Sequence, residues 1–221
     1  MRITVSVAVS IDGYIADTSP DRLRLSSAED FADMYRARAE HDAILVGAET
    51  VRRDNPSLLL REPAPPVHPA RVTLTRSGSL SGDLRFFNGA ARSIVLAPAA
   101  TAAGLEQRLN GKAEVAVLAS EGPASIVRAL NELGITSLFV EGGTRVLTAF
   151  LSAGLFHELR LAVAPFFVGR ADAPRIAGPA TFFHDKHRRL QLIDTRAFGD
   201  TAVQRFGNPN IGEICERLGL S

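Results

Sequence analysis

The chain has 221 residues, of which 46% are hydrophobic and 22% are charged. This length is enough for one α/β domain with a sizeable core. Lys and Arg number 25 and Asp and Glu 24, so the formal net charge of +1 gives no reason to expect a nucleic-acid or membrane-surface partner. The single cysteine, Cys215, excludes an intrachain disulfide and a zinc site built from several cysteines.

The apolar segments and the histidines favour neither a membrane span nor a metal site. No apolar run approaches the ~20 residues that cross a bilayer, and the N-terminus enters an alternating strand without a signal-peptide pattern. The five histidines show no ligand spacing beyond His184-x-x-His187, which lies in a polar segment. We find no repeat or linker, so the sequence predicts one cytoplasmic domain over residues 1–221.

Short apolar stretches alternate with helical patterns along most of the chain. Runs rich in Val, Ile and Leu predict strands at residues 2–10, 43–46, 71–75, 93–97, 114–119, 136–140 and 157–164. Helices are predicted at residues 26–41, 48–55, 99–109, 123–133 and 144–151. Ser26 and Glu29 would form a capping box at the start of the first helix. The alternation predicts an α/β fold with a mainly parallel sheet and helices on both of its faces.

The C-terminal part departs from this alternation. Residues 189–195 and 201–206 predict a closing antiparallel hairpin around Gly199-Asp200, because a Gly-Asp pair between two β-prone runs is typical of a turn. Residues 210–218 predict a short helix. The apolar residues 161–168, with Phe182-Phe183, would either form a dimer interface or fill the core.

The residues from His41 to Arg61 hold the densest group of candidate ligand contacts. Gly47 ends a buried strand and lets a ligand approach the backbone. Thr50 and Asp54 then lie one turn apart on the following helix, whose N-terminus suits a phosphate. Arg61 follows on an extended segment, where its planar guanidinium could grip a second anion. A strand–Gly–helix turn is also common in α/β proteins without a ligand, so both interpretations stay open.

Two further strand ends and one helix end carry candidate contacts. Thr75-Arg76-Ser77 combines two hydroxyls with a guanidinium and would clamp a phosphate, or form an ordinary solvated loop. Gly142-Gly143 follows Glu141 and precedes a helix, where backbone can approach a diphosphate. Two glycines are a weaker signal than the three-glycine dinucleotide fingerprint. Arg38 is either a substrate anchor or a helix-end cation.

Taken together, these motifs resemble the pyrimidine reductases of riboflavin biosynthesis, which have the dihydrofolate-reductase-like fold. The matching pieces are Ser10-Ile11-Asp12-Gly13, Arg38, residues 42–51, residues 54–58, Arg61, residues 140–144, and Ala164-Pro165 with Gly169. Larger members carry a zinc deaminase domain with His-x-Glu and Pro-Cys-x-x-Cys motifs. This sequence lacks both motifs, so we expect a stand-alone reductase, and the resemblance implies a homodimer.

The resemblance implies an NADPH-dependent enzyme that reduces a phosphoribosylamino-pyrimidine to its ribitylamino form, by hydride transfer to the ribose C1′. The implied cofactor contacts are Val9, Gly47, Thr50, Asp54, Thr75, Arg76, Ser77, Gly142, Gly143, Thr144, Arg145, Val146 and Leu147. The implied substrate contacts are Arg38, Leu58, Arg61 and Glu141. Thr75-Arg76-Ser77 would face the 2′-phosphate of NADPH, and Asp54 would supply or relay the proton.

Two other functions stay open at this point. A reductase of the same fold could act on dihydrofolate or another pterin-like ring, where Arg61 would bind a carboxylate in place of a sugar phosphate. A non-catalytic nucleotide-binding homologue would keep the fold without the chemistry. The joint presence of Asp54, Glu141 and Arg61 argues against the second alternative, because a protein that only binds has no need for an acid beside an anion clamp.

Overall fold

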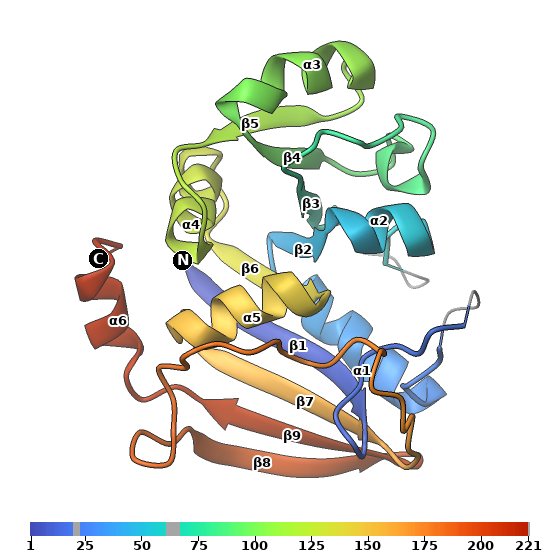
Figure 1. The fold of residues 1–221 in the computed structure, drawn as a ribbon, viewed down its shortest axis with the longest axis vertical. Coiled ribbons are helices and arrows are strands. Elements are labelled where there is room, and N and C mark those ends of the chain that lie inside the picture. Colours follow the sequence, from blue (N-terminus) through green and yellow to red (C-terminus); the bar gives the residue numbers. More distant parts are fainter. Residues whose placement is uncertain (20–22, 61–66, 221) are drawn as a thin grey trace. The chain divides into compact units, whose positions relative to one another are not determined.

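The computed structural model of the chain describes residues 1–19, 23–60 and 67–220 (Figure 1). Their contacts group them into two compact units. Unit 1 contains Met1 and Ala37–Phe139, and unit 2 contains Arg2–Arg36 and Val140–Ser221. Arg61, one of the expected substrate contacts, lies outside the described residues. That both units belong to one domain over residues 1–221 stays a prediction.

Unit 1 is built on a parallel sheet with the strand order β5-β4-β3-β2. Its strands are β2 (Ala43–Gly47), β3 (Ala70–Leu74), β4 (Ser93–Pro98) and β5 (Glu114–Leu118). Its helices are α2 (Ala48–Asp54), α3 (Ala99–Leu109) and α4 (Pro123–Glu132), with a 3-10 turn at Arg85–Phe87. Consecutive parallel strands are joined by crossovers, and α2, α3 and α4 lie in these connections.

The sequence of unit 1 explains its strands and helix ends. Ile44, Val72 and Val95 are fully buried, as expected for parallel strands that are covered on both faces. Helix α3 ends at Asn110, which adopts the left-handed conformation common after a helix. Helix α4 begins with Pro123, whose missing N–H is not needed in the first turn.

Unit 2 combines parallel and antiparallel pairing in the strand order β1-β7-β9-β8. Its strands are β1 (Arg2–Ser10), β7 (Glu158–Ala164), β8 (Gln191–Phe198) and β9 (Thr201–Gly207). Strand β1 pairs with β7 in parallel, while β9 pairs antiparallel with both β7 and β8. Helices α5 (Thr144–Ala153) and α6 (Ile211–Arg217) belong to this unit; in Figure 1, α5 crosses in front of β1.

Two elements continue across the boundary between the units. Helix α1 (Ala28–Ala39) begins in unit 2, and strand β6 (Ser137–Gly142) leads from unit 1 into unit 2. Ser27 caps α1 in place of the expected Ser26–Glu29 capping box, and its backbone N–H donates to Thr201 Oγ1 at 3.2 Å and not to a side chain of the first turn. Ser27, not Ser26, accepts a hydrogen bond at its Oγ from the Asp30 N–H at 3.1 Å. The Ser27 hydroxyl also donates to the Phe198 carbonyl at 2.7 Å, a long-range contact that fixes which serine caps the helix.

The predicted fold class is confirmed. The structure is α/β with mainly parallel strands in the first part and an antiparallel hairpin near the C-terminus. The hairpin turns at Gly199 and Asp200, as predicted, and Gly199 has a φ of 59°, which favours glycine.

Candidate active site

In unit 1, two of the predicted cofactor segments meet at one edge of the sheet. Strands β2 and β3 are parallel, and their register sets Gly47 opposite Leu74. Gly47 leads into α2, while Thr75 begins the loop after β3. Because the carboxyl ends of neighbouring parallel strands lie ~4.8 Å apart, the Gly47 and Thr75 segments are neighbours at the carboxyl edge of the sheet, the edge at which open α/β sheets bind ligands.

Helix α2 presents Thr50 and Asp54 one turn apart, as predicted from their spacing. Thr50 is half-buried. The Asp54 side chain is 14% exposed and its Oδ1 accepts a hydrogen bond from Arg53 Nε at 2.9 Å. Asp54 Oδ2 accepts no hydrogen bond within the described segments, so this oxygen is the one available to a ligand. Gly47 has an ordinary extended backbone, with φ −71° and ψ 151°, so its role would rest on the missing side chain.

The segment after α2 contains two residues in the left-handed region. Asn55 has a φ of 40° and Leu58 a φ of 55°. Residues other than glycine rarely adopt such angles, and those that do cluster at functional sites. Leu58, an expected substrate contact, has a buried side chain that is 7% exposed. A substrate would therefore meet its backbone and not its isobutyl group.

Arg71 binds the backbone of this strained segment at the Ser57 carbonyl. It was not predicted as a site residue. It lies in β3, is 0% exposed, and donates to five acceptors. These acceptors are the Ser57 carbonyl at 3.3 Å, the Arg85 carbonyl at 3.4 Å, Asn88 Oδ1 at 2.7 Å, the Ala91 carbonyl at 2.7 Å and Ser93 Oγ at 2.9 Å. None is a carboxylate, and burial lowers the pKa of the Arg71 guanidinium. The one sequence signal was a charged residue inside an apolar strand.

The three residues after β3 have different surroundings. Thr75 is buried, and its Oγ1 accepts a hydrogen bond from the Gly78 N–H at 3.1 Å. Arg76 Nη2 pairs with Glu121 Oε2 at 2.6 Å, with side chains 73% and 70% exposed. Because exposed ion pairs contribute only ~0–1 kcal/mol, this contact leaves Arg76 available to an anion. Ser77 Oγ accepts a hydrogen bond from the Ser79 N–H at 3.3 Å.

In unit 2, the predicted diphosphate turn lies between β6 and α5. The Gly142–Gly143 peptide bond is cis, and Gly142 has a φ of 117°, which favours glycine. A Cβ at Gly142 would lie 3.2 Å from a Leu147 methyl group, so a side chain is also disfavoured by space. Glu141, the expected pyrimidine contact, is half-buried at the end of β6.

The first turn of α5 offers backbone donors and few side chains to a phosphate. The N–H groups of Val146 and Leu147 donate to the Gly143 carbonyl at 3.0 and 3.1 Å, and their side chains are buried. Thr144 Oγ1 donates to the Arg175 carbonyl at 2.7 Å. The N–H groups of Thr144 and Arg145 therefore remain as first-turn donors, consistent with an anion at a helix N-terminus.

The remaining two predicted residues are both buried. Val9 lies in β1 opposite Val163 of β7, near the carboxyl ends of both strands. Arg38 lies near the end of α1 and is buried, which excludes its interpretation as a solvated helix-end cation.

Asp12 holds two loops of unit 2 together, a role that sequence reasoning did not find. Ser10 Oγ donates to its Oδ1 at 2.5 Å, and the N–H groups of Val168 and Gly169 donate to its carboxylate at 3.1 and 2.7 Å. Desolvation raises the pKa of Asp12, but these hydrogen bonds outweigh it and lower the pKa to about 2. These hydrogen bonds join the turn after β1 to the loop after β7. In the sequence, the pair Asp12-Gly13 predicted only the turn.

The part of the chain that the structure describes contains neither a membrane-spanning helix nor a cluster of metal-ligating side chains. In residues 1–19, 23–60 and 67–220, no helix has the length and apolarity needed to span a membrane. No group of three or more His, Cys, Asp or Glu side chains in those same ranges is arranged to hold a metal ion.

The names of curated relatives of this chain specify either a pyrimidinone 5′-phosphate reductase or riboflavin biosynthesis. A 2,5-diamino-6-ribosylamino-4(3H)-pyrimidinone 5′-phosphate reductase from Archaeoglobus fulgidus is 30% identical over 215 residues, which cover 92% of this chain and 97% of that protein. Riboflavin biosynthesis protein RibD from Bacillus amyloliquefaciens is 32% identical over 179 residues, 79% of this chain but 48% of RibD. This chain therefore spans nearly all of the first relative and about half of the second.

Solved structures show the same fold. A diaminohydroxyphosphoribosylaminopyrimidine deaminase/5-amino-6-(5-phosphoribosylamino)uracil reductase from Thermotoga maritima superposes with a TM-score of 0.75 at 26% identity, over 94% of this chain and 56% of that chain. Riboflavin biosynthesis reductase Rib7 from Saccharomyces cerevisiae gives a TM-score of 0.68 at 19% identity, over 93% of this chain and 89% of that chain, and shows the fold alone.

The family described as the RibD C-terminal domain matches residues 1–203. The resemblance inferred from the motifs is thereby confirmed at the level of the family. Because this match spans nearly the whole sequence, and a named reductase aligns over almost its full length, the chain belongs to the RibD C-terminal domain family.

Proposed function

We propose that this protein is an NADPH-dependent reductase that converts a phosphoribosylamino-pyrimidine into its ribitylamino form in riboflavin biosynthesis. The observation that carries the proposal is the alignment with the Archaeoglobus fulgidus protein, whose name specifies a ribosylamino-pyrimidinone 5′-phosphate. The proposal extends that activity to this chain, because the alignment covers 97% of that relative.

The residues present fit a dinucleotide. A side chain at Gly142 would crowd Leu147, and the first turn of α5 keeps two N–H donors for a diphosphate. In unit 1, Gly47 and Thr50 lie at and just after the carboxyl end of β2, and Thr75-Arg76-Ser77 would face the 2′-phosphate that distinguishes NADPH from NADH. When bound, NADPH supplies the hydride.

The chemistry assigns a role to each proposed substrate contact. The ribosylamine opens to an imine; hydride adds to C1′ and a proton adds to the imine nitrogen. Asp54 would supply or relay that proton through Oδ2. Arg38 and Arg61 would hold the 5-phosphate, and the Leu58 backbone would border the sugar. Glu141 would accept hydrogen bonds from the amino and ring N–H groups of the pyrimidine.

The names of the relatives define two versions of the substrate. The Archaeoglobus fulgidus name specifies a 2,5-diamino-pyrimidinone, whereas the Thermotoga maritima name specifies a 5-amino-uracil. The two rings differ at C2, which carries an amino group in one and a carbonyl oxygen in the other. An ionised Glu141 accepts hydrogen bonds but cannot donate them, so a contact at C2 would favour the amino form.

Purified protein tests the proposal directly. NADPH oxidation is followed with three compounds offered separately: the diamino-pyrimidinone, the amino-uracil and dihydrofolate. We expect turnover of at least one phosphoribosylamino-pyrimidine and none of dihydrofolate. Turnover of dihydrofolate alone would contradict the proposal and move the protein to a pterin-like substrate.

The proposal also includes a cytoplasmic homodimer. Ala162, Ala164 and Phe183 are buried in the single chain, so this predicted interface segment largely fills the core. The exposed large apolar side chains of unit 2 include Phe167, and Leu192 and Ile193 of β8. Together with the edge position of β8, they support an interface on this side of unit 2. Sedimentation equilibrium of the wild type and of a Leu192→Glu, Ile193→Lys variant would test it.

A further inference from the structure

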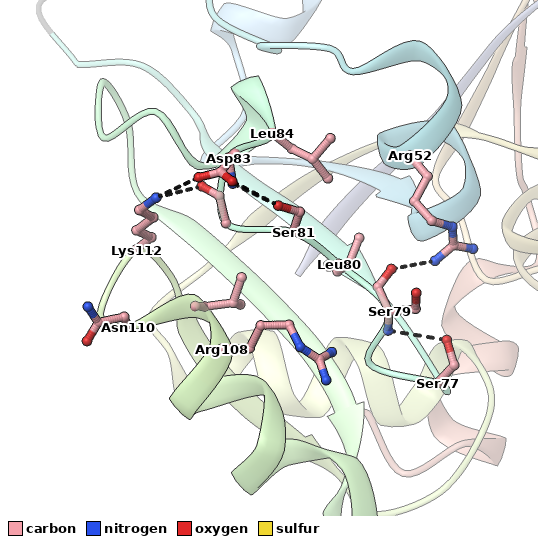
Figure 2. Close-up of a pocket in the computed structure, with 12 residues that line it drawn as sticks. Arg52, Ser77, Ser79, Leu80, Ser81, Asp83, Leu84, Arg108, Asn110 and Lys112 are labelled. Carbon is pink, nitrogen blue, oxygen red and sulfur yellow. Dashed lines mark hydrogen bonds and ion pairs between the residues drawn. The ribbon is translucent and has the colours of Figure 1, made fainter.

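In unit 1, the connection between β3 and β4, residues 75–92, is bound to the end of α2. Arg52 lies in the last turn of α2, and its Nη1 donates to the Ser79 carbonyl at 3.1 Å (Figure 2). Further along, the same connection forms the 3-10 turn at Arg85–Phe87. The connection therefore contacts α2 just before residues 55–58, the segment that contains the two left-handed residues.

The first residue of this segment is bound to the 3-10 turn through its side chain. Asn55 is the C-cap of α2, with φ 40° and ψ 52°. Its Oδ1 accepts a hydrogen bond from the Arg85 N–H at 2.7 Å. Asparagine tolerates the left-handed conformation better than most residues, and here its side chain also joins the end of α2 to the turn.

The Ser57 carbonyl is held through Arg71. Arg71 Nη1 donates to this carbonyl at 3.3 Å and to the Arg85 carbonyl at 3.4 Å. The same nitrogen makes its shortest hydrogen bond, 2.7 Å, to Asn88 Oδ1, directly after the turn. Because the N–H groups of a guanidinium have fixed directions, the bond to Asn88 orients the nitrogen that reaches Ser57.

The turn itself is anchored in the core of unit 1. Phe86 is 0% exposed and Phe87 is 3% exposed, and their ring centroids lie 5.0 Å apart. Ser93 Oγ, at the start of β4, donates to the Phe86 carbonyl at 3.1 Å. A residue positions a binding segment well only when packing and hydrogen bonds fix its own place, and the turn meets this condition.

Leu58 has a conformation that requires such support. Its φ of 55° is unfavourable for a residue with a Cβ. Backbone in such a conformation persists where the surrounding structure over-determines it. The hydrogen bonds at Asn55 and Ser57 fix the chain within three residues of Leu58.

We propose that Asn55 and Asn88 are positioning residues for the pyrimidine substrate, acting through the backbone of residues 55–58. Asn55 binds the start of the segment to the 3-10 turn. Asn88 orients Arg71, which holds the segment at its third residue. Together they set where the backbone of Leu58 meets the sugar of the substrate. The proposal rests on the proposed function, which places Leu58 at the substrate.

Asn55→Gly tests the first contact. Glycine adopts the left-handed conformation readily, so this variant removes the side-chain bond without straining the backbone. Loss of one hydrogen bond should raise KM for the pyrimidine about two- to tenfold and leave the Kd of NADPH unchanged. The matched control is Asn110→Gly. Asn110 is the left-handed C-cap of α3, with φ 44°, and its side chain makes no hydrogen bond within the described ranges, so KM should not change.

Two substitutions of Asn88 test the second contact. Asn88→Ala removes an acceptor of Arg71 and should also raise KM about two- to tenfold. Asn88→Asp keeps an acceptor oxygen at the same place and should restore the wild-type KM. A merely structural role would lower the melting temperature of Asn88→Ala without separating KM for the pyrimidine from the Kd of NADPH.

Unchanged KM in Asn55→Gly or in Asn88→Ala would overturn the role of that asparagine, and equal losses of pyrimidine and NADPH affinity would overturn the proposal. Failure of the proposed function would appear in the wild type, as no turnover of either pyrimidine. Hydrogen exchange of residues 55–58 then decides whether the turn positions the segment. Faster exchange in Asn55→Gly and Asn88→Ala, but not in Asn110→Gly, supports positioning, and unchanged exchange overturns it.

Discussion

The two units each bury an arginine in a strand, but they neutralise it differently. Arg160 of β7 is 4% exposed and binds two carboxylates of α1, with Nη2 2.8 Å from Asp33 Oδ2 and also bonded to Asp30. Arg71 of β3 is 0% exposed, and its hydrogen-bond acceptors among the described residues are all neutral oxygens. Arg160 therefore joins a helix to a sheet, whereas Arg71 fixes loops around a predicted substrate segment.

The different surroundings of Arg160 and Arg71 indicate different roles for the two buried charges. A buried ion pair roughly offsets its own desolvation, so it chiefly specifies how two elements pack. A buried cation that meets only neutral acceptors offsets its desolvation cost through hydrogen bonds alone, so we infer that it is retained for the geometry that it imposes. Arg71 imposes that geometry on the Ser57 carbonyl, next to the left-handed Leu58. We therefore expect stability effects from both arginines and functional effects from Arg71.

The largest stability effect is expected for Arg160→Met. It leaves Asp30 buried without a counter-charge, and loss of one partner of a buried pair costs about 3–5 kcal/mol. Urea unfolding measures this loss. Adding Asp30→Asn should recover part of it, because the neutral amide needs no cation. A double variant that is less stable than Arg160→Met would contradict the ion-pair account.

A smaller effect on stability is expected for Arg71→Met, which leaves neutral acceptors unsatisfied at a cost of about 2–3 kcal/mol. This variant should also raise KM for the pyrimidine substrate about tenfold, through misplacement of the segment at Leu58, with NADPH binding unchanged. The matched control is Arg92→Met, an exposed arginine paired with Glu114, which should cost under ~1 kcal/mol. Equal losses of substrate and NADPH affinity would reduce Arg71 to a purely structural role.

Asp12 is a third case, an anion without a cationic partner in these contacts. Its carboxylate accepts hydrogen bonds from two N–H groups and a serine hydroxyl. Its pKa is lowered to about 2 from the usual 3.8. The stability that it adds is therefore present above pH ~4 and is lost as the pH falls through that interval towards 2. Melting temperatures of the wild type and of Asp12→Asn should differ at neutral pH and converge in acid. A difference that is constant with pH would show that the carboxylate is not held as described.

Elements with local signals were predictable from the sequence. The bounds of α3 at Ala99 and Leu109 match the prediction because Pro98 and Asn110-Gly111 mark both ends. The turn at Gly199-Asp200 was predictable for the same reason. The family motifs likewise located the strand-end segments at Gly47 and Gly142, since those motifs are continuous in sequence.

Interactions between distant residues were not predictable. Asp12 binds the N–H groups of Val168 and Gly169, and no local pattern pairs those positions. The sequence predicted Arg71 only as the first residue of a strand. Its structural role could not be predicted, because its partners come from several separate loops.

The destination of the hydride tests the central claim most directly. Purified protein is supplied with the phosphoribosylamino-pyrimidine and with NADPH that carries deuterium at both C4 positions of the nicotinamide, and the product is analysed by NMR. The account predicts one deuterium on C1′ of a ribitylamino product. Deuterium on the pyrimidine ring, or reduction without deuterium in the product, would contradict it.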